Sequence, residues 1–299
     1  MQPTLAAAAF GLSMGLLVPA LSQAAPLPQD ELERSCWLRH TAERTRVNMR
    51  EPTVVDFSNL RHGDSVRAPF LVEFAVRGMG VAPAGKPHPG TGHHHLLVDT
   101  PLPAFVTEKI PFSDHHKHFG KGQTQAVLDL PPGPHTLRLL FADHEHRPHF
   151  VYSREITVNV TGPRTAQAPK IDRRNFDASC AAWYQDELAR PKPPGDWVSI
   201  VNVRDGETLS SPFNLRFGVD GYGVCAEGQV IERTGRFVLD LLKDGALVRT
   251  QALNNGATQT TLALPNGSYR LRLRFVDNSQ RDLLPASETN ITVAGQERL

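Results

Sequence analysis

An internal repeat constrains the fold of this chain more than any other feature. Residues 54–81 read VVDFSNLRHGDSVRAPFLVEFAVRGMGV and residues 197–224 read WVSIVNVRDGETLSSPFNLRFGVDGYGV, so counterparts lie 143 positions apart. A second matching pair, residues 124–143 and 258–277, has an offset of 134, so the second copy lacks nine residues in between. A repeat this long indicates two homologous domains rather than a solenoid of short units.

Each copy reads as a series of short β-strands. Residues 70–76 (FLVEFAV) and 213–219 (FNLRFGV) alternate with period two, which is typical of half-buried strands. Residues 126–141 and 261–275 each predict two strands joined as a hairpin, around Pro-Pro-Gly and Pro-Asn-Gly respectively. We therefore expect an all-β fold of two tandem immunoglobulin-like β-sandwich domains, each preceded by a short helical segment.

The repeat and the segments around it predict five regions. They are a signal peptide (1–25), a helical prelude (26–53), a histidine-rich β-sandwich domain (54–161), a linker with a second helical prelude (162–196) and a degenerate second β-sandwich domain (197–295).

The first 25 residues predict export. An apolar run ends in small residues, with Ser22-Gln23-Ala24 or Gln23-Ala24-Ala25 as the cleavage site, although no Lys or Arg precedes the run. We expect a periplasmic or secreted protein whose mature chain has no membrane span. In such a compartment, Cys36, Cys180 and Cys225 predict one disulfide and one remaining thiol, and the sequence does not choose the pair.

The charge balance argues against a nucleic-acid partner. The formal net charge is +1 and the chain has no basic stripe, whereas nucleic-acid binding depends on clustered positive charge. The 40% of hydrophobic residues is ordinary for a folded protein and suffices for a sizeable core.

The histidines are confined to the first copy. All 13 lie at or before His149, and the second copy has none. Because two homologous domains share a fold but not these residues, the fold does not require them. A function in the first domain, or drift, has to account for them.

The second copy predicts how the triplet His93, His94 and His95 is oriented. It aligns with Arg236, Phe237 and Val238, in a stretch where Phe237 and the leucines at 239 and 241 alternate with Arg236, Val238 and Asp240. The transferred alternation turns His94 toward the core and His93 and His95 together to the other face, with Cα atoms about 7 Å apart.

Two more clusters supply further candidate metal ligands. The segment DHHKHFGKGQT begins at Asp114 and ADHEHRPHF begins at Ala142, each next to a predicted strand end. The predicted metal ligands are His93, His95, His118, His146, His149 and His94, with His116 and His144 as secondary candidates. Imidazole suits copper and zinc, and with an ordinary histidine pKa of about 6.5 the affinity should fall in acid. His94 could equally be a satisfied, half-buried histidine.

At these motifs the chain resembles a bacterial family of exported domains known as domain of unknown function family 4399. The motifs are NLRHGDSVRAPFLVEFAVRGMGVAPAG, TGHHHLLVD, HFGKGQT, LPPGPHTLRLLFAD and HRPH, within residues 54–160. The resemblance implies an exported β-rich domain and no named activity. It singles out His93, His94, His95, His118, His146 and His149, together with Gly92, Asp99, Gly120, Lys121 and Gln123. The second domain keeps the scaffold motifs and departs at every histidine.

Three functions are compatible with this pattern. We favour an exported metal-binding protein, a copper or zinc carrier, buffer or sensor, whose second domain is a spacer or docks a periplasmic or envelope protein. A metalloenzyme would need a base such as Asp99, Asp114 or Glu145 beside a zinc ion, but the chain has no HExxH motif, and we favour a protein that is not an enzyme. The remaining alternative is an interaction or envelope module without metal, in which the histidines form a polar or aromatic groove or a charge that responds near pH 6.

Overall fold

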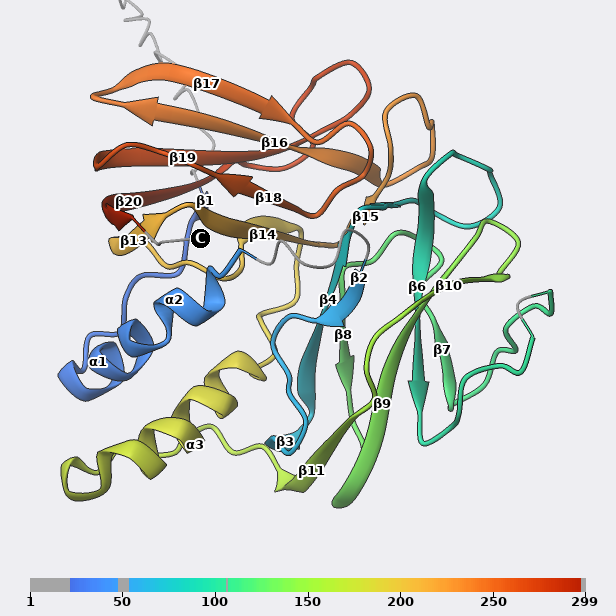
Figure 1. Ribbon diagram of the computed structural model, residues 1–299, viewed down its shortest axis with the longest axis horizontal. Helices are drawn as coiled ribbons and strands as arrows, with labels where there is room; N and C mark the ends of the chain where they lie inside the picture. Colours follow the sequence, from blue (N-terminus) through green and yellow to red (C-terminus); the bar gives the residue numbers. More distant parts are fainter. Residues whose placement is uncertain (1–21, 48–53, 106, 297–299) are drawn as a thin grey trace, which may run out of the picture.

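The computed structural model describes residues 22–47, 54–105 and 107–296 (Figure 1). Residues 1–21 of the predicted signal peptide lie outside this part, so export remains a prediction. The residues around the predicted cleavage site form β1 (Ser22–Gln23), which pairs in parallel with β20 (Ser287–Gln296) near the other end of the chain. In the described part of the chain, no helix combines the length and hydropathy needed to cross a bilayer.

Domain one (residues 54–163) consists of two sheets. The smaller sheet has the order β2-β4-β8, with β2 (Val54–Phe57), β4 (Phe70–Arg77) and β8 (Gln125–Leu128). The larger has the order β3-β11-β9-β6-β5, with β10 beside β9 and β7 beside β6. Its strands are β3 (Ser65–Ala68), β5 (Gly80–Val81), β6 (Thr91–Val98), β7 (His116–His118), β9 (Gly133–Ala142), β10 (Pro148–Tyr152) and β11 (Ile156–Pro163).

Domain two (residues 197–296) repeats this arrangement. Its smaller sheet is β12-β14-β18, and its larger sheet contains β13, β20, β19, β16, β15 and β17. Their bounds are β12 (Trp197–Ile200), β13 (Glu207–Ser211), β14 (Phe213–Asp220), β15 (Gly223–Val224), β16 (Thr234–Lys243), β17 (Ala246–Ala252), β18 (Gln259–Leu262) and β19 (Gly267–Val276). The two-sandwich, all-β prediction is confirmed, and the inward residues of β4 and β14 alternate as their sequences indicated.

The predicted hairpins are wrong. β8 pairs with β4, whereas β9 pairs with β6 and β11, so the Pro-Pro-Gly segment carries the chain from one sheet to the other. The same holds for β18 and β19 around Pro265. Proline has no N–H to donate to a neighbouring strand, so the strand pairing stops at these residues. The crossing between the sheets then lets Leu128 and Leu137 pack in one core. Period-two patterns give each strand a buried face, but they do not say which neighbour the strand pairs with.

The helical segments pack on the opposite domains. α1 (Glu31–Arg39) and α2 (Thr41–Arg44) precede domain one, yet the carbonyl of Thr45 accepts the N–H of Asn214 in domain two at 2.8 Å. After the 3₁₀ turn at Arg173–Asn175, α3 (Phe176–Leu188) precedes domain two, yet the carbonyl of Ala189 accepts the N–H of Leu71 in domain one at 2.8 Å. The disulfide Cys36–Cys180 ties the exchanged segments together and leaves Cys225 as a buried free thiol.

The two domains also meet directly, through a matched pair of backbone contacts. The N–H of Val81 donates to the carbonyl of Gly256, and the N–H of Val224 donates to the carbonyl of Gly122, each at 2.8 Å. The approach is so close that a Cβ on Gly80 would lie 1.6 Å from the carbonyl oxygen of Asn255. Buried side chains of both domains form one continuous core as a result.

Gly80→Ala should therefore weaken the contact between the domains. We expect it to lower the free energy of unfolding by about 1–3 kcal/mol, which is typical of overpacked sites. Urea denaturation would measure the loss. Gly90→Ala is the control, because a Cβ there meets nothing within 4 Å and only the backbone at φ 69° is strained. A Gly80→Ala variant as stable as the unchanged protein would contradict the close approach.

Candidate metal centre

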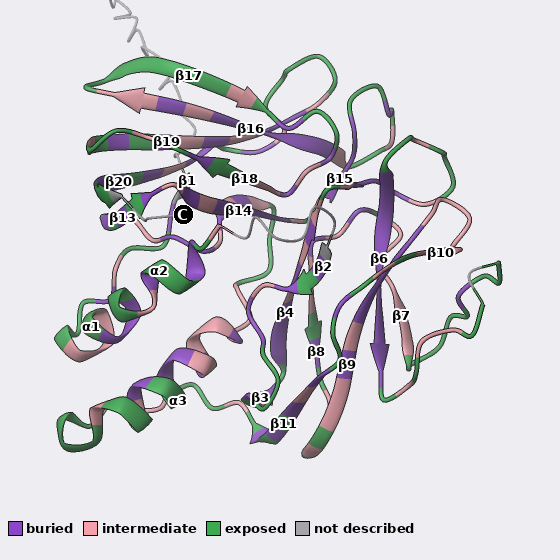
Figure 2. Ribbon diagram, in the orientation of Figure 1, coloured by how far each residue is buried: buried purple, intermediate pink, exposed green. Residues whose placement is uncertain are grey.

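Strand β6 carries the histidine triplet and is buried along its whole length (Figure 2). The ring of His94 packs in the core between Phe74 and Phe141, with ring centroids 5.1 Å and 4.9 Å away. His93 and His95 lie on the other face with their Nε2 atoms 3.0 Å apart. The alternation inferred from the second copy is thus the one that the strand adopts.

The face that carries His93 and His95 is covered by a second, smaller core. Leu97, Leu140 and Ala142 pack there against Ile110 from the loop between β6 and β7. His93 and His95 are consequently 0% exposed. A loop that the sequence did not predict as a cover therefore removes these imidazoles from water.

Strand pairing brings His118 to the same place. In the antiparallel ladder of β6 and β7, His118 lies directly opposite His95, and opposite residues of such a ladder share a face. Potential ligand atoms of His93, His95 and His118 all lie within 4.8 Å of one another.

His146 completes the cluster from a tight turn after β9. The carboxylate of Asp143 accepts the N–H groups of Glu145 and Arg147 and holds the turn, as Asp277 does in domain two. His146 has a φ of 71°, and its Nε2 lies 3.1 Å from that of His118. Asp143 is thus a turn residue, and Asp277 has the same part in domain two.

The four rings have the spacing of a shared binding site. Ring centroids of His93, His95, His118 and His146 lie between 4.7 Å and 6.0 Å apart in all pairs. With Zn–N bonds of about 2.0–2.1 Å, tetrahedral nitrogen ligands lie about 3.3–3.4 Å from one another. The two Nε2 pairs at 3.0 Å and 3.1 Å are close to that separation, so small ring movements would fit the cluster to one ion.

Burial keeps the cluster neutral. Desolvation, reinforced by the neighbouring imidazoles, lowers the pKa of His93 to about 3 and that of His95 to about 2. Burial also lowers the pKa values of His118 and His146. The rings therefore offer lone pairs at neutral pH, and protons should compete with a metal only at lower pH than the ordinary value of about 6.5 suggests.

Two histidines of the cluster lack a hydrogen-bond partner for the ring nitrogen that points away from it. The Nδ1 atoms of His93 and His95 are buried and have no hydrogen-bond partner among the described residues. Metal-bound histidines usually donate their other N–H to a carboxylate or carbonyl, and loss of such a partner typically weakens binding 10–100-fold. The donor set fits a transition-metal ion, but one held less tightly than in a site with complete outer partners.

The other predicted ligands lie outside the cluster. Nε2 of His149 contacts the carbonyl of Thr91 at 3.2 Å, and His144 and His149 line a separate cavity of about 380 Å³. His116 lies opposite Leu97 and its Nδ1 contacts the hydroxyl of Ser113 at 3.0 Å. His94 has neither ring nitrogen hydrogen-bonded and belongs to the core. It is not the hydrogen-bonded, half-buried histidine that the sequence offered as the alternative, because its ring is buried and its two nitrogens have no partner among the described residues.

Sequence reasoning missed one member of the site, Phe112. Its ring lies against His118 and His146, with centroids 4.7 Å and 5.2 Å away, while the residue stays 62% exposed. Phe112 therefore forms a lipophilic cover between the histidines and solvent. The only signal was its position two residues before the segment DHHKH, which does not reveal how the loop folds back.

Domain two fills the same position with a fixed cation. Arg236, the counterpart of His93, is buried and its guanidinium donates to Glu227, Asn254 and Asn278 at 3.0–3.2 Å. Pairing of β16 with β17 places Val238 opposite Ala252, the relation that His95 has to His118. The scaffold thus holds a positive charge here in domain two and four neutral imidazoles in domain one.

His94 should make the metal-free protein sensitive to acid. Burial lowers its pKa to about 3, so between that value and the unfolded pKa of about 6.5 only the unfolded chain takes up the proton. Stability is lost as the pH falls, by about 2 kcal/mol for this group between pH 7 and pH 5.

His94→Phe should remove that loss, because Phe237 occupies this position in domain two. Urea denaturation in the presence of a chelator would measure it. The reverse change, Phe237→His, should add a similar loss. Unchanged pH dependence in both variants would contradict the buried, neutral state of His94.

Comparisons with known proteins give one family match and several distant structural likenesses. Residues 72–161 match the family described as "Domain of unknown function (DUF4399)", and no curated protein matches the chain. Among solved structures, fibronectin(III)-like modules of Clostridium thermocellum CbhA are similar at 10% identity (81% of this chain, 94% of that one, TM-score 0.22). A two-domain fibronectin type III segment of chicken tenascin matches at 9% identity (81% and 99%, TM-score 0.21).

A further structural match is CopC from Methylosinus trichosporium OB3b. It is 18% identical, over 32% of this chain and 89% of that one, with a TM-score of 0.20. These likenesses are too distant to carry an argument about what this chain binds. The family match covers the strands and turns that hold all four clustered histidines, and this part of the chain, residues 72–161, is similar to the DUF4399 family.

Proposed function

We propose that this protein binds one divalent transition-metal ion through His93, His95 and His118, with His146 as the fourth ligand. The observation that supports this most directly is the pair of Nε2–Nε2 separations, 3.0 Å and 3.1 Å, in a cluster of two buried and two half-buried histidines. A neutral imidazole has one N–H and one lone pair, so each of these pairs is an N–H···N hydrogen bond in one tautomer and two converging lone pairs when the N–H groups lie on Nδ1. The low pKa values keep the rings neutral, and a metal ion would bind the second tautomer without having to displace an extra proton.

The ligand chemistry favours Cu²⁺ or Zn²⁺. An all-imidazole set suits both ions, and the usual order of affinities among divalent metals favours copper. Neither the thiolate nor the thioether ligands that select Cu⁺ belong to the cluster: Cys225 lies in domain two, and Met79 packs against the main core.

Two features favour a carrier or buffer over a structural metal site. Domain two adopts the same fold with Arg236 in place of the cluster, so the scaffold does not need the ion. The unpartnered Nδ1 atoms of His93 and His95 lower the affinity, which suits exchange. We further propose export to the periplasm or beyond, with domain two as a spacer or a dock for an envelope protein.

A hydrolytic metalloenzyme is the less supported function. With four protein ligands the ion has no open position for water, which catalytic zinc requires. Two of the candidate bases are engaged elsewhere, since Asp99 accepts from Thr136 and pairs with His135, and Glu145 pairs with Arg147. Asp114, the third, is exposed in the loop before β7.

Metal titration of the untagged, metal-stripped chain tests the proposal. We expect one equivalent of Cu²⁺ or Zn²⁺ to bind, and His95→Ala or His118→Ala to weaken binding by more than about 100-fold, because each removes a direct ligand. His149→Ala is the matched control and should change the affinity little. Less than about a tenth of an equivalent bound, or an equal loss in His149→Ala, would refute the proposal.

Gly120→Ala should weaken binding as much as the loss of His118 does, although it removes no ligand. A Cβ at residue 120 would lie 2.2 Å from Nε2 of His118, so the ring would have to leave the cluster. Gly120 also lines the cavity of about 580 Å³ between the domains, so the displaced ring has space to enter. Calorimetry should show a loss comparable to that of His118→Ala, with native circular dichroism; full affinity would exclude this placement of His118.

A further inference from the structure

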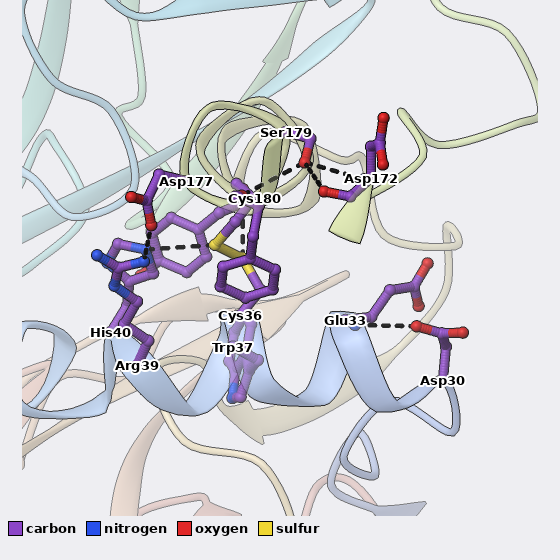
Figure 3. Close-up of a disulfide and its surroundings, with 12 residues drawn as sticks. Asp30, Glu33, Cys36, Trp37, Arg39, His40, Asp172, Asp177, Ser179 and Cys180 are labelled. Carbon is purple, nitrogen blue, oxygen red and sulfur yellow. Dashed lines mark hydrogen bonds and ion pairs between the residues drawn. A yellow bond between two sulfur atoms is a disulfide. The ribbon is translucent and has the colours of Figure 1, made fainter. Parts of the chain in front are cut away.

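The exchanged helical segments meet at the disulfide, which sits in its own apolar cluster. Cys36 from α1 and Cys180 from α3 are 0% and 1% exposed, and Trp37, Trp183 and Tyr184 surround them. Figure 3 shows the two sulfurs between the helices, with His40 beside them. The disulfide joins the two segments, but neither the fold nor the histidine cluster gives His40 a role.

The ring of His40 is held in a position that suits a metal ligand. It stacks on Tyr184 with centroids 4.0 Å apart, and its Nδ1 lies 3.3 Å from a carboxylate oxygen of Glu43. Glu43 therefore favours the proton on Nδ1, which leaves the lone pair on Nε2. That atom lies 4.0 Å from the sulfur of Cys180. A carboxylate that orients the far nitrogen is the usual outer partner of a metal-bound histidine.

We propose that reduction of the Cys36–Cys180 disulfide turns this place into a second metal site, in which two thiolates and Nε2 of His40 bind Zn²⁺. The three ligand atoms already lie within 4.8 Å of one another. The site shares no residue with the histidine cluster, so it goes beyond the function proposed above.

The ligand set and its surroundings fit zinc. Two thiolates and one imidazole form a known zinc donor set, with Zn–S bonds of about 2.3 Å, and leave a fourth position for water. At a tetrahedral angle the sulfurs lie about 3.8 Å apart, a separation that side-chain rotation reaches once the bond is broken. Burial lowers the pKa of His40, which keeps the ring neutral and able to bind at neutral pH.

A phosphine can reduce the disulfide. The phosphine takes the oxygen of one water molecule and becomes a phosphine oxide, and the two hydrogens of that water complete two thiols as the S–S bond breaks. When the ion binds, both thiols release their protons and form Zn–S bonds, while His40 donates its existing lone pair. In the oxidised protein neither sulfur is a thiolate, so this site is closed to the metal.

Cobalt(II), a spectroscopic substitute for zinc, distinguishes this site from the histidine cluster, because only thiolate ligands give a sulfur-to-cobalt charge-transfer band. The full chain carrying Cys225→Ala is suitable, since position 225 corresponds to Ala82 in domain one and only two cysteines remain. We expect the phosphine-reduced protein, in the absence of air, to bind one cobalt ion more than the oxidised protein and to show this band.

Two variants make the test specific. His40→Asn should weaken cobalt binding at this site at least tenfold, whereas His95→Ala should leave the charge-transfer band unchanged. Two free thiols with native circular dichroism but no band would overturn the proposal. So would an unchanged cobalt affinity in His40→Asn, or a reduced chain that loses its native circular dichroism and does not regain it with cobalt.

Discussion

The reciprocal packing of the two domains is the contact on which the rest of the structure depends. Paired hydrogen bonds, from Val81 to Gly256 and from Val224 to Gly122, bring the backbones together where a side chain would not fit. The helical segments then cross to the opposite domains, and the disulfide joins them. Because apolar side chains of both sandwiches form one core, neither domain can move far without exposing it.

The second copy shows what the scaffold requires and what it tolerates. At one position of the sandwich, domain two buries Arg236 with three oxygen acceptors, while domain one places His93 among three other imidazoles. A buried guanidinium needs hydrogen-bond acceptors, and domain two supplies them. Buried neutral imidazoles can hydrogen-bond one another through Nε2, and their mutual separations also suit the cation proposed above. The same fold thus supports a buried guanidinium in one domain and a cluster of neutral rings in the other.

Some of this followed from the sequence because side chains on a strand alternate with a strict period of two. The alternation of Phe237 placed His94 in the core and His93 beside His95. Strand partners were less accessible: the Pro-Pro-Gly and Pro-Asn-Gly segments read as hairpins but connect different sheets. Pairing depends on which neighbour completes the core, and local turn residues do not encode it.

The sequence by itself determined the duplication, the β-sandwich class, the confinement of histidines to one copy and the faces of β6. The tertiary structure decided which histidines meet: the turn at Asp143 selects His146 over His149, and Phe112 covers the site from the loop before β7. It also decided that Cys36 pairs with Cys180, 144 residues away. Such contacts join segments far apart in the chain, so they arise from how the two sandwiches and their exchanged helices pack rather than from any local pattern.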